Sequence, residues 1–247
     1  MRLNTKAVKV RVEGGEKLVD LVSDGYKSTV AVDAILTGTG RVPNVNDLNL
    51  EAAGVEYDNT TGVRVDDFLQ TSNRRIYAAG DACLEHKFTH TADASARVAI
   101  RNALFFGRQR FSALTIPWCT YTDPEIAHVG LYARQALEGN IPVKTFTIPM
   151  HDVDRAIADG EETGFVKIHV KERTDRILGA TIVARHAGEM INEISLAMVA
   201  GVGLNTLARV IHAYPTQAEA IKKAADAYNR TRLTPVIQSL LRHWLRW

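Results

Sequence analysis

Strand-forming segments follow one another along the second half of the chain, and this order constrains the fold more than any other feature. A helical pattern interrupts them only near 131–138. Strands in succession, rather than strands alternating with helices, favour an α+β domain built on an antiparallel sheet. The expected strands are residues 117–122, 143–149, 164–170 and 177–184.

The first forty residues have the pattern of a β-meander. Val8, Val10 and Val12 alternate with charged residues, as in a half-buried strand, and glycine-containing turns follow. Residues 34–36 are wholly apolar, which is typical of a strand buried on both faces. The elements expected before residue 107 are strands at 8–12, 18–22, 26–32, 34–36, 63–65 and 75–79 and helices at 48–56 and 91–106.

Three helices are expected after the last strand. The first covers roughly 187–200 and has an apolar face. Thr216 and Glu219 have the spacing of a capping box, which predicts a helix at about 216–229. Thr234-Pro235 supplies an N-cap and a first helical residue for the last helix. That helix carries one apolar stripe, formed by Val236, Ile237, Leu240, Leu241, Trp244 and Leu245.

The net charge and hydropathy of the chain argue against two classes of partner, nucleic acids and membranes. The 30 basic and 28 acidic residues are intermixed and leave a net charge of +2, so we expect no nucleic-acid partner and no membrane partner. No apolar run approaches the roughly 18 residues of a spanning helix, and because no apolar stretch follows the first six residues, we expect no secretory signal. A cytoplasmic protein is therefore expected. Membrane-surface binding by the last helix is a weaker alternative to its packing against the preceding helix.

Gly80-Asp81 is the most informative short motif. It ends the expected buried strand at 75–79, and the carboxyl end of such a strand is where α/β sheets bind ligands. Glycine permits close approach to the backbone, and the carboxylate of Asp81 can accept hydrogen bonds from polyol hydroxyls. An aspartate in a surface turn is the commoner meaning of an isolated Gly-Asp pair.

An ordered series of motifs surrounds that pair. It comprises Gly38-x-Gly40-Arg41-x-Pro43-Asn44, Val63-x-Val65-Asp66, Thr71-Ser72 and Ile76-Tyr77-Ala78-Ala79-Gly80-Asp81. In this order the sequence resembles the pyridine-nucleotide-disulfide oxidoreductases. Further on, 121–130, 164–167, 177–180 and 187–191 resemble the dimerisation domain of that family. The resemblance covers nearly the whole chain.

The resemblance implies a fold, cofactors and site residues. Residues 1–112 would be the remaining, carboxyl-terminal part of the NAD(P)H- and FAD-binding domains, with a β-meander, buried strands and one long helix. Residues 113–247 would be an α+β dimerisation domain with an antiparallel sheet and a helical tail, forming a homodimer. The parent enzyme would use FAD and NAD(P)H. The implied cofactor-binding residues are Gly40, Arg41, Gly80, Asp81, Thr89, His90 and Thr91, with Thr89 and Thr91 able to cap the helix that follows.

Tyr214 occupies a signature position of the family. Many relatives read His-Pro-Thr-x-x-Glu, in which histidine is the acid–base and glutamate orients it, whereas this chain has Tyr214 and Glu219. A tyrosine, with an ordinary pKa of about 10, is a poor proton shuttle at neutral pH. The tyrosine resembles the mercuric-reductase branch, although the chain lacks that branch's terminal cysteine pair. The resemblance makes Tyr214 and Glu219 the catalytic candidates; Glu219 is equally well explained as a capping residue. His212, two residues earlier, is not expected to replace the missing histidine.

Motifs that the chemistry needs are missing from this sequence. No G-x-G-x-x-G occurs, and Cys83 and Cys119 are too far apart to be the family's redox pair. We therefore expect a fragment of a flavoenzyme, with a stand-alone dimerisation module without catalysis as the alternative. A metal site formed by Cys83, Glu85, His86 and His90 is disfavoured, because their spacing matches no zinc motif. No metal site is expected.

Overall fold

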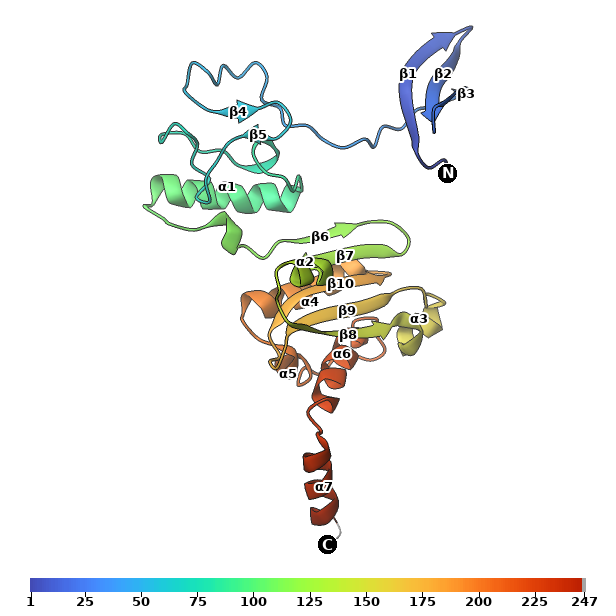
Figure 1. The fold of residues 1–247 in the computed structure, drawn as a ribbon, viewed down its shortest axis with the longest axis vertical. Helices are drawn as coiled ribbons and strands as arrows, with labels where there is room; N and C mark the ends of the chain where they lie inside the picture. The colour runs from blue at the N-terminus through green and yellow to red at the C-terminus, as the bar shows by residue number, and fades with distance from the viewer. Residues whose placement is uncertain (246–247) are drawn as a thin grey trace. The chain divides into compact units, whose positions relative to one another are not determined.

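The computed structural model describes residues 1–245 and divides into two compact units. The first unit is Met1–Val42, and the second begins at Pro43. The first unit is an antiparallel meander of β1 (Thr5–Glu13), β2 (Glu16–Ser23) and β3 (Tyr26–Val32) (Figure 1). Its tight turns place Gly14-Gly15 and Asp24-Gly25 at positive φ, as two-residue hairpin loops require. The expected meander is confirmed.

Burial in the first unit differs from the sequence prediction. Val8, Val10 and Val12 are more than half exposed, so alternation predicted the strand but not a covered face. Residues 34–36 form no strand, and Leu36 is 97% exposed. The expected doubly buried strand is wrong, because an apolar run becomes a strand only where neighbouring strands accept its amides and carbonyls. Within this unit no strand pairs with it.

The second unit opens with an irregular segment packed around one long helix. It contains β4 (Tyr57–Asp58), β5 (Gly62–Val63), the 3₁₀ turns Gly80–Ala82 and Phe111–Ala113, and α1 (Thr89–Leu104). The helix is the one expected, two residues earlier at each end. Two small cores hold the segment, one around Leu69, Leu84 and Val98 and one around Val45, Val55 and Val63.

Two elements expected in this segment are absent from it. Residues 48–56 form turns rather than a helix, with Asn49 and Gly54 at positive φ. The strand expected at 75–79 is reduced to one bridge between Tyr77 and Gln70, and 63–65 pairs only at its ends. A buried strand needs partner strands on both edges, and among the described residues 75–79 are paired on one side only, by the bridge from Tyr77 to Gln70.

A five-stranded antiparallel sheet forms the second part of this unit. Its order is β6-β7-β10-β9-β8, which confirms the expected sheet. Four strands match the sequence prediction, whereas β7 was not predicted. The bounds are β6 (Pro117–Thr120), β7 (Glu125–Gly130), β8 (Val143–Pro149), β9 (Phe165–Lys171) and β10 (Ile177–Ala184).

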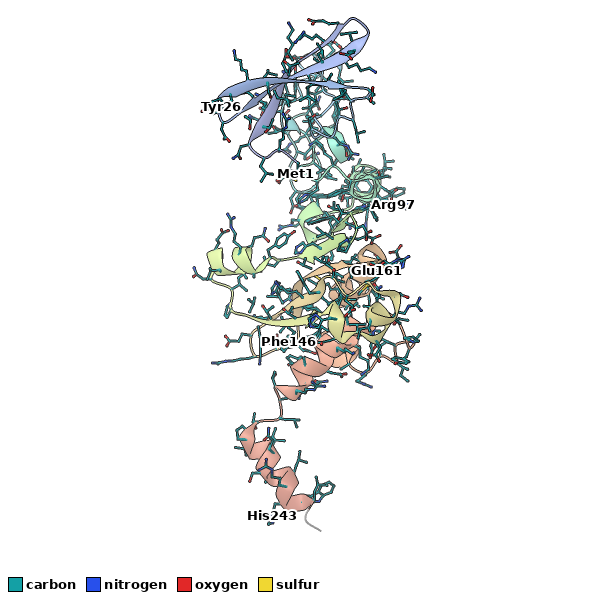
Figure 2. All side chains as sticks on the ribbon, turned by 90° about the vertical axis from the view of Figure 1, so that its right-hand side faces the viewer. Met1, Tyr26, Arg97, Phe146, Glu161 and His243 are labelled. Atoms are coloured by element: carbon teal, nitrogen blue, oxygen red, sulfur yellow. The ribbon has the colours of Figure 1, made fainter. Side chains whose placement is uncertain are left out.

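Two helices share the core of this sheet. Alternate residues of β9 and β10 (Val166, Ile168, Val170; Ala180, Ile182, Ala184) are fully buried against α4 (Ala187–Val199) and α6 (Glu219–Arg230). Phe146 of β8, labelled in Figure 2, meets Tyr228 of α6 edge to face, with ring centroids 5.7 Å apart. Short helices α2 (Ala133–Glu138), α3 (Asp154–Asp159) and α5 (Leu204–Leu207) join these elements; only α2 was predicted.

The helical tail confirms one predicted cap and corrects another. α6 begins at Glu219 after Ala218, and the hydroxyl of Thr216 donates to the carbonyl of Ala213, so the capping box at 216–219 is wrong. α7 (Pro235–Trp244) begins as predicted, with the Thr234 hydroxyl accepting from the amide of Ile237 at 3.4 Å. Across residues 1–245, no helix is both long and apolar enough to cross a membrane.

Two buried histidines lie on the face of the sheet that is turned away from α4 and α6. His128 is 2% exposed and bonds through its two ring nitrogens to the Thr181 hydroxyl and the Gly130 carbonyl, each at 2.9 Å. His169 is 3% exposed and pairs with the Thr145 hydroxyl at 2.8 Å. Burial lowers the pKa of both imidazoles, because it disfavours the charged form.

These histidines predict that the fold weakens in mild acid. With lowered pKa values in the folded state, the unfolded chain binds more protons at a pH just below its own histidine pKa of about 6.5. The free energy of unfolding should therefore rise with pH through this window and level off above about 6.5. Urea unfolding at a series of pH values measures the slope. The double variant His128→Gln/His169→Gln should flatten it; an unchanged slope would contradict the assignment.

Candidate functional site

The Gly80-Asp81 turn packs directly on helix α1. The Gly80 amide donates to the buried Ser95 hydroxyl at 2.9 Å. Gly80 has φ +70°, and a Cβ there would lie 3.1 Å from the Cβ of Ala92, so the turn tolerates little besides glycine. Asp81 is exposed, and its carboxylate makes no hydrogen bond or ion pair with any described residue. The sequence motif is thus held rigidly while its acceptor oxygens stay available.

The amino terminus of α1 has no side-chain cap. The N-cap position falls on Phe88, while Thr89 and Thr91 are the first and third helical residues. The expectation that these threonines cap the helix is therefore wrong. Thr91 is 1% exposed, and its hydroxyl is buried without a hydrogen-bond partner. Uncapped amides and the helix dipole together favour a negatively charged or hydrogen-bonding group at this end.

His90 links α1 to the sheet. Its Nε2 lies 2.8 Å from the carbonyl oxygen of Pro117, and its ring stacks on Phe88 with centroids 5.4 Å apart. Beside it lies a cavity of about 440 Å³ between the start of α1, strand β6 and the start of α4. It is lined by His90, Thr91, Ala94, Leu114, Thr115, Ile116, Pro117, Trp118, Cys119, Tyr121, Gly188, Ile191 and Asn192.

Gly40 and Arg41 belong to the first unit, whereas the other predicted cofactor-binding residues belong to the second. Gly40 has φ +103°, which explains glycine at this position. Arg41 is exposed. The structure therefore brings together Gly80, Asp81, Thr89, His90 and Thr91 around one helix end, and leaves Gly40 and Arg41 in a separately folded unit.

The Tyr214 hydroxyl has a partner that the sequence did not indicate. It donates to Oδ2 of Asp154, at the start of α3, at 2.7 Å. This hydrogen bond and the charge of Asp154 raise the pKa of the Tyr214 phenol above its ordinary value. Tyr214 is 69% exposed, so its ring is accessible while its proton is committed to the carboxylate. α3 was not predicted, and no motif linked residues 60 positions apart.

Glu219 does not orient Tyr214 by a hydrogen bond. One carboxylate oxygen lies 3.7 Å from Nζ of Lys223, and the other is buried without a hydrogen-bond partner. Lys223 also donates to the carbonyl of Asp152 at 2.5 Å. Glu219 contributes only a minor charge effect to the raised pKa of Tyr214. In this chain Asp154 holds the tyrosine, and Glu219 is engaged at the start of α6.

His212 is paired with an acidic residue of α4. Its buried ring lies 3.0 Å through Nε2 from Oε1 of Glu193 on α4. This agrees with the prediction that it does not replace the family histidine. The contact ties the segment before Tyr214 to α4.

The two cysteines are unpaired and unactivated. Burial raises the pKa of the Cys83 thiol to about 11, and burial together with Glu125 and Glu189 raises the pKa of Cys119. Neither therefore has the thiolate character of a redox cysteine. In residues 1–245, no three or more histidine, cysteine, aspartate or glutamate side chains gather in a way that could hold a metal ion.

Known protein families match almost the whole chain in two stretches. Residues 116–225 match the dimerisation domain of pyridine nucleotide-disulphide oxidoreductases, and residues 1–102 match a second pattern described as pyridine nucleotide-disulphide oxidoreductase. The chain belongs to this family. The five-stranded sheet with α4 and α6 is its dimerisation domain, as the sequence resemblance implied.

Similar proteins include disulfide and mercuric reductases. The chain is 36% identical over 222 residues to a mercuric reductase of Staphylococcus aureus, covering 90% of this chain and 41% of that protein. It is 34% identical to a dihydrolipoyl dehydrogenase of Buchnera aphidicola, covering 94% and 49%. A solved structure of the HOCl-induced flavoprotein disulfide reductase RclA from Escherichia coli aligns with a TM-score of 0.77 at 26% identity, covering 90% and 50%. The chain thus spans half or less of the length of these proteins.

The Tyr214–Asp154 contact predicts a measurable titration shift. Asp154→Asn removes the charge that favours the protonated phenol, so the pKa of Tyr214 should fall toward about 10. Phenolate absorbance against pH, with the Tyr214→Phe variant subtracted, isolates this tyrosine. Asp159→Asn, on the same helix but paired with Arg155, is the matched control and should leave the titration in place. An unshifted titration in Asp154→Asn would disprove the contact.

Proposed function

We propose that this chain forms part of an FAD-dependent NAD(P)H oxidoreductase of the disulfide-reductase or mercuric-reductase type. In it, the chain supplies part of the FAD site and the homodimer interface. The observation that carries the proposal is the uncapped amino terminus of α1, with the unpartnered Thr91 hydroxyl inside it and the Gly80-Asp81 turn packed against the same helix. The cytoplasmic location and the lack of a nucleic-acid partner remain predictions.

The residues around α1 fit a flavin dinucleotide. Bound FAD would supply the hydride acceptor that NAD(P)H requires. Asp81 offers carboxylate oxygens to ribityl or ribose hydroxyls. The first amides of α1 and the Thr91 hydroxyl offer donors to a carbonyl or to negative charge, which the helix dipole stabilises. Gly80 keeps the backbone close to α1 and clear of any group that lies against it.

Tyr214 fits a substrate-contacting role better than a proton-shuttling one. Because its proton is donated to Asp154 and its pKa is raised, the phenol stays protonated at neutral pH. Its ring and the lone pairs of its oxygen remain accessible, so it can accept a hydrogen bond from a substrate or lie beside a thiolate-bound metal ion. Glu219 remains a catalytic candidate by family position, with one unpartnered carboxylate oxygen.

Exposed apolar residues support a homodimer interface around α4 and the segment before Tyr214. Leu196 and Val199 of α4 are 69% and 70% exposed, and Ile211 is 96% exposed. The contact between His212 and Glu193 fastens the segment to α4, so these residues are presented on a fixed backbone. Exposed apolar residues that gather in one patch are typical of protein–protein interaction sites.

Flavin titration tests the cofactor contact. Purified chain should quench added FAD fluorescence saturably, and Asp81→Ala should weaken binding about tenfold, because a charged acceptor is lost. The control Asp93→Ala, on the exposed side of α1 and paired with Arg97, should bind like the unmodified chain. A dimer without any saturable quenching would instead support the stand-alone dimerisation module.

Sedimentation velocity tests the interface. The unmodified chain should sediment as a dimer at micromolar concentration, and Ile211→Arg should shift it to monomer by placing a charge in the apolar contact. The control is Leu137→Arg at an exposed leucine of α2, which should remain dimeric. A monomeric unmodified chain, or a dimer unaffected by Ile211→Arg, would contradict the proposed interface.

A further inference from the structure

The apolar stripe of α7 belongs to none of the apolar cores formed by residues 1–245. Its residues recur at helical spacing and are each 40–73% exposed, and no residue of α7 is buried. Figure 2 shows α7, with His243 labelled, carrying its side chains free of any neighbouring element. The expected packing of this stripe against the preceding helix is therefore wrong. The stripe consists of Val236, Ile237, Leu240, Leu241, Trp244 and Leu245.

The polar residues of the tail carry positive charge alone. From Ala227 onward the sequence contains no aspartate or glutamate, while it contains four arginines: Arg230, Arg232, Arg242 and Arg246. Arg230 and Arg242 are exposed and form no ion pair with any residue between 1 and 245, and Gln238 and His243 accompany Arg242 on the side of α7 opposite the stripe. An otherwise nearly neutral chain thus concentrates uncompensated cations next to an exposed apolar face.

This combination selects one kind of occupant. A second copy of α7 could cover the stripe, but because Arg242 lies on the opposite side of the helix, that packing would leave the positive charge without a complementary partner. A surface with both apolar depth and negative charge complements both faces at once. The boundary between the headgroups and acyl chains of an anionic membrane is such a surface. Amphipathic helices with leucines, a tryptophan and a cationic polar face bind there. Trp244, at the helix end, suits the interface between apolar and hydrated layers.

We propose that α7 docks the protein on an anionic lipid surface. The ten-residue helix lies in the plane of the surface, with Leu240 and Leu241 inserted and Arg242 among the headgroups. At about 1.5 Å per residue it is far too short to span a bilayer, so the attachment is peripheral and reversible. Residues 231–234 separate α7 from α6, and the dimerisation domain needs no rearrangement for the docking.

Vesicle co-sedimentation of the whole chain tests the proposal. Vesicles of phosphatidylcholine with about one-third phosphatidylserine should bind the chain at least tenfold more tightly than phosphatidylcholine alone, and added salt should remove most of the difference. Arg242→Glu should weaken binding to the anionic vesicles and leave binding to neutral ones unchanged. Equal binding to both kinds of vesicle, or none to the anionic kind, would overturn the proposal.

A matched pair of variants separates the stripe from general hydrophobicity. Leu240, 65% exposed, lies in the stripe, and Leu104, 68% exposed, lies at the end of α1. Leu240→Glu should reduce anionic-vesicle binding more than tenfold, while Leu104→Glu should leave it unchanged. Tryptophan fluorescence should shift to the blue on binding, and Trp244→Phe should remove a large part of that shift. If Leu240→Glu instead lowers the sedimenting mass of lipid-free protein and no vesicle binding occurs, the stripe binds a second copy and the proposal is wrong.

Discussion

The burial of alternate residues of β9 and β10 beneath α4 and α6 is the constraint on which the rest of the second unit, from Pro43 onward, depends. Val166, Ile168, Ala180 and Ile182 are wholly removed from water, and such close packing fixes the relative positions of sheet and helices. The packed sheet fixes the position of β6, and the carbonyl oxygen of Pro117 in β6 contacts Nε2 of His90. The start of α1 is thereby held against the sheet, with a cavity between them.

The same packed sheet explains why Tyr214 faces Asp154. The segment before the tyrosine is tied to α4 by His212 and Glu193, and α6 begins directly after it. α3 lies between β8 and β9 in the chain, so the sheet edge delivers Asp154 to the tyrosine. The carboxylate of Asp154 keeps the proton on the Tyr214 hydroxyl. An acid–base residue would instead have to release and recover its proton during the reaction. A tyrosine held in this way therefore suits the proposed substrate contact better than proton transfer.

Exposed apolar surface is distributed in two distinct ways. Around α4 and Ile211 it is mounted on a rigid core, which suits a shape-complementary protein partner. On α7 it is mounted on a separate cationic helix without acidic residues, which suits a deformable anionic surface. The two surfaces therefore differ physically. The apolar residues around α4 lie on a packed core, whereas those on α7 lie beside positive charge that no acidic residue of the helix balances.

The sequence by itself determined the elements whose signals are local. Alternation predicted β1, helical periodicity predicted α4, and Thr234-Pro235 placed the start of α7; the ordered motifs around Gly80-Asp81 indicated the family. Tertiary structure decided everything that depends on a distant partner. Residues 34–36 and 75–79 look like buried strands, but the first pairs with no strand of its unit and the second keeps only the bridge between Tyr77 and Gln70. The Thr216 hydroxyl donates to the carbonyl of Ala213 instead of capping a helix. The Asp154–Tyr214 contact and the exposed stripe of α7 follow the same rule, because hydrogen bonding and burial are properties of two surfaces, and a sequence pattern describes only one of them.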